Sequence, residues 1–398
     1  MSWQLYLALS FAMFMEYAVW GAWFPVLAAR LLGPLKFSGK QTGWIYATLP
    51  LACIVSPLVA GQLADRYFNT EWILGISHLA GAVLIFLAAS RTDFKNLFVV
   101  MLLYSVFYAA TLPLANSIMF YHLGKVYADE AGADAASGKI FLWAPVAWAL
   151  AGYFLTGWRW KFKTEQQGRD CLYLAAILSL IFGVGCLLLL PATPPEQTGA
   201  TPIVKALSML GQGGFLVFVI ISIVAASLMQ FYFQGTAPFM QDMGIASRNV
   251  PASMAIAQAV QAAATFFLLG VVLGKLGYKW TLVVGAACWV LLYIIYVQEK
   301  PRWLIVIAQS LHGLAYVFFI IVGQIFVKTV APKEILSSMQ ALIFAATTGL
   351  GLLLGTQLAG AVMDRFRKEQ KFQWGPIFLV PCLIMLACVL ALAILFKG

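Results

Sequence analysis

Glu16 is a carboxylic acid in the middle of an otherwise apolar stretch, Phe11 to Leu27. A charge at mid-bilayer costs roughly 3 kcal/mol on insertion scales, so an acid kept there is expected to face a cavity or a partner. At helical spacing Glu16 shares a face with Trp20 and Trp23. We predict that Glu16 lies between these aromatic surfaces and carries a proton. The alternative is an acid near a helix end that reaches interfacial water.

Two pairs of amides follow in the second half of the chain. Gln230 and Gln234 are four residues apart and Gln258 and Gln261 are three apart, so each pair lies on one helix face. An amide offers donors and acceptors without charge, which suits a neutral solute rich in hydroxyl and carbonyl groups. The alternative is that these amides bond between helices and hold the bundle together, at about 0.6 kcal/mol each.

Other candidates lie beside these polar positions. His312 shares a stripe with Gln309 and Tyr316, and it is a candidate proton partner for Glu16 if spans one and ten face one cavity. Flat aromatic faces beside amides suit a planar ring such as a nucleobase, or the apolar face of a sugar. The remaining candidate solute contacts are Trp20, Trp148, Phe141, Phe233 and Asn116.

The composition places these residues in a membrane. Of the 398 residues, 62% are hydrophobic and 10% are charged, against about 25% charged in soluble domains. At about 33 residues for each span and its connection, the chain has room for roughly twelve helices. The net charge of +10 is scattered over short loops, which favours anionic lipid neighbours and argues against nucleic-acid binding.

The apolar runs fall into two sets of six. Their order predicts an N-terminal six-helix half over residues 1–191, a Pro-rich linker over 192–212 and a C-terminal half over 213–398. The predicted spans are 4–32, 41–64, 71–90, 95–122, 139–158, 172–191, 213–240, 250–276, 279–298, 302–330, 334–365 and 375–397.

No pattern indicates covalent chemistry. The sequence has no Ser-His-Asp spacing, Walker loop or cluster of metal ligands, and its six cysteines lie mostly in apolar runs. We therefore expect no enzyme activity, no metal and no cofactor. We expect a monomer in the lipid bilayer that is driven by a gradient.

The stretch Gly61 to Trp72 resembles the G-x-L-A-D-R signature of the major facilitator superfamily. The resemblance implies that Asp65 and Arg66 brace a cytoplasmic loop between spans two and three, with both termini in the cytoplasm. This orientation leaves most basic residues outside, against the positive-inside tendency.

Four stretches resemble the bacterial nucleoside permeases of the nucleoside:proton symporter family, which belongs to that superfamily. They are YAATLPLANSIMFYHL (108–123), VWGAWFPVLA (19–28), AYVFFIIVGQIFV (315–327) and PKEILSSMQALI (332–343). The resemblance runs from about Leu5 to Phe396. It implies a major facilitator fold in the bacterial inner membrane, with a central cavity at mid-depth and alternating access.

The resemblance also implies site residues. The family's solute-contacting amides fall on Gln230 and Gln258, while Gln261 replaces a carboxylate. Phe141 stands at a basic position and Val317 at an acidic one. Relatives have an amide where this chain has Glu16, which suggests that proton coupling has moved.

We therefore predict an all-α polytopic membrane protein with twelve transmembrane helices in two six-helix halves. Its expected task is secondary transport of a small neutral solute, with nucleosides first and proton coupling through Glu16. The alternatives are a transporter of sugars or other hydroxylated metabolites, an uncoupled facilitator and a non-transporting membrane receptor.

Overall fold

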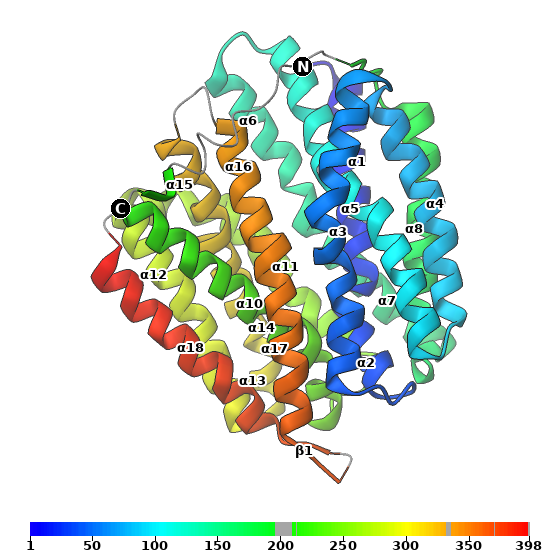
Figure 1. The fold of residues 1–398 in the computed structure, drawn as a ribbon, viewed down its shortest axis with the longest axis vertical. Helices are drawn as coiled ribbons and strands as arrows, with labels where there is room; N and C mark the ends of the chain where they lie inside the picture. The colour runs from blue at the N-terminus through cyan, green and yellow to red at the C-terminus, as the bar shows by residue number, and fades with distance from the viewer. Residues whose placement is uncertain (196–208, 212, 332–335, 370, 397–398) are drawn as a thin grey trace. The chain divides into compact units, whose positions relative to one another are not determined.

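The computed structural model describes residues 1–195, 209–211, 213–331, 336–369 and 371–396 (Figure 1). Within these residues, twelve helical segments are long and apolar enough to cross a membrane, as predicted. They are Trp3–Leu32, Gly39–Arg66, Thr70–Ser90, Phe94–Val126, Ala135–Phe162, Asp170–Leu189, Gly214–Asp242, Val250–Phe267, Leu269–Gln298, Arg302–Val330, Leu342–Arg365 and Trp374–Leu395.

The chain forms two compact units. The first contains Met1–Lys36 and Thr48–Thr198, and the second contains Phe37–Ala47 and Gly199–Gly398. The start of the second span, within Phe37–Ala47, therefore belongs to the second unit. The predicted N-terminal half, residues 1–191, contains the whole of that span. Most of the predicted linker, residues 196–208 and 212, lies outside the described residues.

In the first unit, α1 packs against α7 and α8, and α4 packs against α5 and α8. A three-residue turn, which contains Pro25, separates α1 from α2. The elements of this part of the chain, of which α3 begins in the second unit, are α1 (Trp3–Trp23), α2 (Leu27–Leu32), α3 (Gly39–Arg66), α4 (Thr70–Ser90), α5 (Phe94–Val126), α6 (Glu130–Phe141), α7 (Trp143–Phe162), the 3-10 turn η1 (Thr164–Gln166) and α8 (Asp170–Leu189).

In the second unit, α10 packs against α17 and α18, α12 against α18, and α11 against α14. Its helices are α10 (Gly213–Asp242), α11 (Val250–Phe267), α12 (Leu269–Gln298), α13 (Arg302–Ile307), α14 (Gln309–Ala315), α15 (Val322–Val330), α16 (Leu336–Phe344), α17 (Leu352–Arg365) and α18 (Trp374–Leu395). Its shorter elements are the 3-10 turn η2 (Met209–Gly211), the π-helical segments η3 (Tyr316–Ile321) and η5 (Ala345–Gly351), and the paired strands β1 (Arg367–Lys368) and β2 (Lys371–Phe372).

Gly277 divides α12 at the place where the sequence predicts a loop between residues 276 and 279. Its φ of 67° lies in the region that glycine adopts readily. A break at Leu268, which was not predicted, separates α11 from the start of α12.

Candidate functional site

Glu16 lies in the interior of α1 and is 0% exposed. Its carboxylate accepts a hydrogen bond from the Thr111 hydroxyl of α5, at 2.8 Å. The backbone carbonyl of Glu16 accepts a second bond from the Tyr108 hydroxyl, also at 2.8 Å. The acid is therefore held inside the first unit, and the alternative of an acid near a helix end at interfacial water is wrong.

The second carboxylate oxygen of Glu16 lies 3.0 Å from Nε2 of His78, a residue of α4 that is 2% exposed. His78 is not among the candidate residues predicted from the sequence. A signal was available, because His78 interrupts the apolar run 71–90 and the cost of burying a polar group applies to it as it does to Glu16. The sequence does not show that His78 lies beside Glu16, because that contact depends on how α1 and α4 pack in the folded protein.

An aromatic group lies one turn further along α1. The rings of Trp20 and Trp148 are 5.3 Å apart, and Trp20 also contacts Tyr108 edge to face at 6.1 Å. Gly21 permits this approach, because a Cβ there would lie 2.8 Å from the Trp148 Cα. Trp23 packs against Tyr104 instead. The structure thus brings the predicted pair Trp20 and Trp148 together.

Two other predicted residues belong to the first unit. Phe141 ends α6 and packs against Phe120 at 6.1 Å. Asn116, on α5, has a buried side-chain oxygen with no hydrogen-bond partner among the described residues. At the end of α3, Asp65 and Arg66 are both exposed.

Gln230 of α10 is completely buried, yet neither atom of its amide has a hydrogen-bond partner within the described part of the chain. Its neighbour on the same face, Gln234, donates a long bond of 3.4 Å to the Thr356 carbonyl. On α11, Gln258 and Gln261 are both buried, and the amide oxygen of Gln261 lacks a partner among the residues described. The amide-rich faces predicted from spacing are therefore buried, with much of their hydrogen-bonding capacity unused.

His312 of α14 lies among rings of the second unit. It stacks on Tyr232 at 3.7 Å with an interplanar angle of 6°, and it meets Phe233 edge to face at 5.7 Å. The Trp289 indole donates to its Nδ1 at 3.1 Å. Since Nδ1 accepts, the imidazole carries its hydrogen on Nε2, which has no partner among the described residues.

Tyr316 is partly buried and begins the π-helical segment η3, and Val317 beside it is completely buried. Such segments interrupt α-helices frequently at functional sites. Val317, which the resemblance matches to an acidic residue, lies in an apolar core that includes Ala264 and Phe318.

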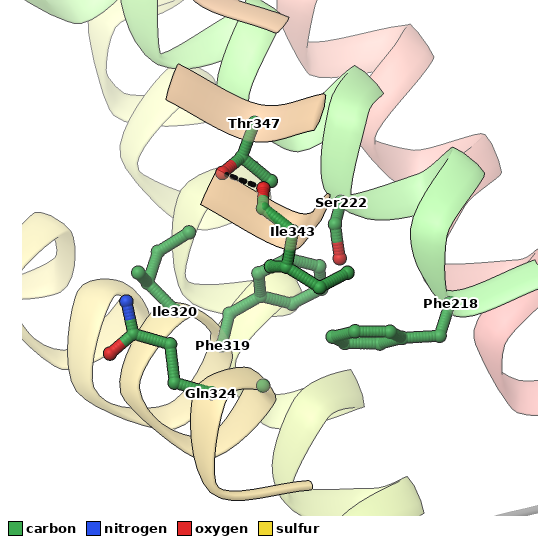
Figure 2. Close-up of a pocket in the computed structure, with 8 residues that line it drawn as sticks. Phe218, Ser222, Phe319, Ile320, Gln324, Ile343 and Thr347 are labelled. Atoms are coloured by element: carbon green, nitrogen blue, oxygen red, sulfur yellow. Dashed lines mark hydrogen bonds between the residues drawn. The ribbon is translucent and has the colours of Figure 1, made fainter. Parts of the chain in front are cut away.

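Figure 2 shows a small pocket of the second unit, where Ser222 of α10 faces residues of η3 and α16. Its volume is about 30 Å³, enough for water but far below the few hundred Å³ of a pocket for a small organic ligand. The lining residues are Phe218, Ser222, Phe319, Ile320, Gly323, Gln324, Ile343 and Thr347, and they include none of the predicted site residues.

Among the described residues, no group of three or more His, Cys, Asp or Glu side chains could hold a metal ion. All six cysteines are buried and free, in line with a packing role.

A family model described as "Nucleoside H+ symporter" matches residues 3–398. The chain is 29% identical to the putative nucleoside transporter YegT of Escherichia coli K12, over 98% of this chain and 92% of that protein. It is 27% identical to the nucleoside permease NupG of the same organism, over 95% and 92%.

Solved structures give the same fold. A crystal structure of a mutant of the nucleoside transporter NupG superposes with a TM-score of 0.87 at 24% identity, covering 99% of this chain and 100% of that one. A bacterial homologue of the human drug peptide transporters PepT1 and PepT2 superposes with a TM-score of 0.72 at 13% identity, covering 98% and 96%. The predicted major facilitator fold is confirmed.

Proposed function

Since this chain belongs to the nucleoside H+ symporter family, we propose that it carries nucleosides into the cell together with protons. We propose that the candidate site residues bind the nucleoside and carry the proton. It is a transporter of the bacterial inner membrane and not an enzyme. The sugar-transporter, facilitator and receptor alternatives are not favoured by its relatives. We further propose that it acts as a monomer, because each chain contains both six-helix halves.

The observation that carries the proposed solute site is the unpartnered amide of Gln230. An unsatisfied buried polar group costs about 1–3 kcal/mol, and Gln230 has two such atoms among the described residues. A nucleoside supplies ring carbonyls, ring N–H groups and ribose hydroxyls, which match an amide in both directions. We propose that binding of the solute offsets the cost of burying Gln230.

Gln258 and Gln261 are proposed to extend this contact along α11, and Tyr316 and Phe233 to pack on the solute. His312 suits a donor role better than proton carriage, because a second hydrogen on Nδ1 would face the Trp289 N–H. We therefore propose that its Nε2–H donates to the solute.

In the first unit, Trp20 and Trp148 are proposed to offer flat faces to the base. Stacking on an aromatic side chain contributes about 1–3 kcal/mol per base in proteins that bind single-stranded nucleic acids. Asn116 remains a candidate polar contact through its unpartnered oxygen, and Phe141 a candidate apolar one. Glu16 is proposed to carry the proton.

Uptake of labelled uridine and adenosine into proteoliposomes tests this function. With an acidic exterior, nucleosides should accumulate above the external concentration, and without a gradient they should only equilibrate. Protein-free liposomes give the leak. Failure to take up either nucleoside would contradict the substrate class, and accumulation that ignores the gradient would contradict proton coupling.

A further inference from the structure

We propose that Glu16 and His78 form a single proton site, in which one proton is shared between the carboxylate and the imidazole and is exchanged during each transport cycle. The proposal rests on the proposed nucleoside symport and names the partner that makes Glu16 able to serve it.

The hydrogen bonds around His78 allow the pair to hold an exchangeable proton. The Ser179 hydroxyl of α8 donates its one hydrogen to the His78 carbonyl, at 3.0 Å. Its oxygen also lies 3.0 Å from the His78 Nδ1, so it can accept a hydrogen from Nδ1 while it donates to the carbonyl. On the other side of the ring, Nε2 and the Glu16 oxygen are 3.0 Å apart and need a hydrogen between them. With a hydrogen on Nδ1, the pair is either imidazolium with carboxylate or imidazole with carboxylic acid, and both forms hold one exchangeable proton.

Because Glu16 and His78 are both buried, loss of the shared proton would be costly. The Phe182 ring covers the imidazole at 4.4 Å, and the acid and the imidazole are both almost completely buried. Removing the proton leaves a net negative charge in an apolar interior, which is strongly unfavourable. The pair should therefore keep its proton until the site opens.

The titratable groups that face the pair are weak acids rather than cations. They are Tyr104 and Tyr108 on α5 and Cys186 on α8. Beyond them, Tyr17 on α1 interacts with Tyr108, and Glu71 on α4 interacts with Cys186. These neutral phenols and the thiol do not neutralise a carboxylate. His78 is therefore the group that balances the charge of Glu16.

The same contacts link the pair to the proposed solute surface. If the shared proton leaves and the remaining ring hydrogen stays on Nδ1, the Nε2 and carboxylate lone pairs face each other at 3.0 Å, which favours opening of the contact. Tyr108 donates to the Glu16 carbonyl and contacts both His78 and Trp20. A shift of α1 against α4 would thus reach Trp20 and Trp148. We infer that proton occupancy and solute contact are coupled through Tyr108.

Glu16→Gln separates coupling from folding, because a glutamine can donate to the Nε2 of a neutral His78 and so keep the hydrogen bond. Two assays in proteoliposomes are compared: accumulation of uridine under a proton gradient, and counterflow, which exchanges uridine without one. The variant should lose accumulation and retain counterflow. Glu71→Gln is the matched control, since Glu71 is another buried acid of this unit, held by the Thr193 N–H and by Asn69, and it should retain both.

His78→Gln keeps the proposal testable should the first variant fail to fold. If His78 shares the proton, its loss shifts the external pH at which accumulation is half-maximal. A purely structural tie would reduce the amount of folded protein and leave that pH unchanged.

The outcomes separate the two proposals. Wild-type protein without counterflow overturns the proposed function itself. With wild-type counterflow intact, three results overturn the shared proton site: accumulation by Glu16→Gln, loss of counterflow in folded Glu16→Gln, or loss of accumulation in Glu71→Gln.

Discussion

Gln230 and Gln309 are two completely buried glutamines of the second unit with opposite hydrogen bonding. The Gln309 amide donates to the Tyr296 hydroxyl and the Ile305 carbonyl and accepts from the Tyr232 hydroxyl. The Gln230 amide has no such bonds among the described residues. One side chain therefore contributes to the fold, and the other is proposed to be kept for a solute.

Replacing Gln230 with Met should separate these roles. Removing an unsatisfied buried amide should leave the free energy of unfolding of the solute-free protein unchanged or raise it. Losing the solute contact should weaken uridine binding by about 1–2 kcal/mol, a factor of roughly 5–30. A uridine titration monitored by thermal shift measures both quantities.

Gln309→Met is the matched control and should give the opposite result. It leaves the Tyr232 and Tyr296 hydroxyls without their amide partner, which costs about 1–3 kcal/mol for each group left unsatisfied. The protein should melt at a lower temperature. If Gln230→Met destabilises the solute-free protein as much as Gln309→Met, the Gln230 amide is structural and the proposed solute contact is wrong.

Glu16 and His78 show how far the sequence predicts the roles of single residues. The cost of burying a charge picked out Glu16 without a structure. The same cost of burial applies to His78. However, the histidines are far apart in the chain, and nothing in the sequence places one of them beside Glu16. The contact depends on how α1, α4 and α8 pack, and periodicity does not determine that.

At the scale of elements, Gly313 lets α14 approach α11 closely. A Cβ at Gly313 would lie 2.1 Å from the Ala257 carbonyl oxygen and 3.0 Å from the Gln261 N–H nitrogen. This contact holds His312 and Gln261, two of the proposed solute contacts, on neighbouring helices.

Gly313→Ala should therefore disturb both stability and binding. Overpacking of this kind costs about 1–3 kcal/mol, and the shift of α14 should raise the uridine concentration needed for half-maximal uptake. Gly270→Ala is the control, because a Cβ there meets nothing within 4 Å, and alanine should match or improve helix stability. Equal melting temperatures and equal uridine affinities for the two variants would show that the close contact is unimportant.

The helices were predictable because each span is a long apolar run, and the loop at Gly277 because polar residues interrupt the pattern. The π-helical segments η3 and η5 were not predictable, since one extra residue in a turn leaves hydrophobicity unchanged. The resemblance matches Val317 to an acidic residue, but only the structure shows that Val317 lies in an apolar core.

Across the whole molecule, the distribution of basic residues argues against the predicted orientation with both termini in the cytoplasm. The structure gives a reason to discount some of these charges. Arg159 is paired with Asp170 at 2.6 and 2.8 Å in the interior, and Arg30 donates to the backbone carbonyls of Gln167, Ala89 and Arg91. These arginines stabilise the first unit, so their position says less about topology than free loop charges do.

Cysteine labelling tests the orientation. The native cysteines are buried, so an impermeant maleimide should report cysteines introduced at the exposed positions Tyr67 and Gln166. Gln166→Cys should label in intact cells and Tyr67→Cys only after permeabilisation. The reverse pattern would place the termini outside.

The most direct test of the account is to record the entry of protons and uridine together. Uridine is added to proteoliposomes that enclose a pH dye, with equal pH on both sides. Wild-type protein should acidify the lumen as uridine enters, whereas Glu16→Gln, which retains uridine counterflow, should cause no acidification. Uridine-dependent acidification of equal size in both proteins would contradict the role of the Glu16 and His78 pair in symport.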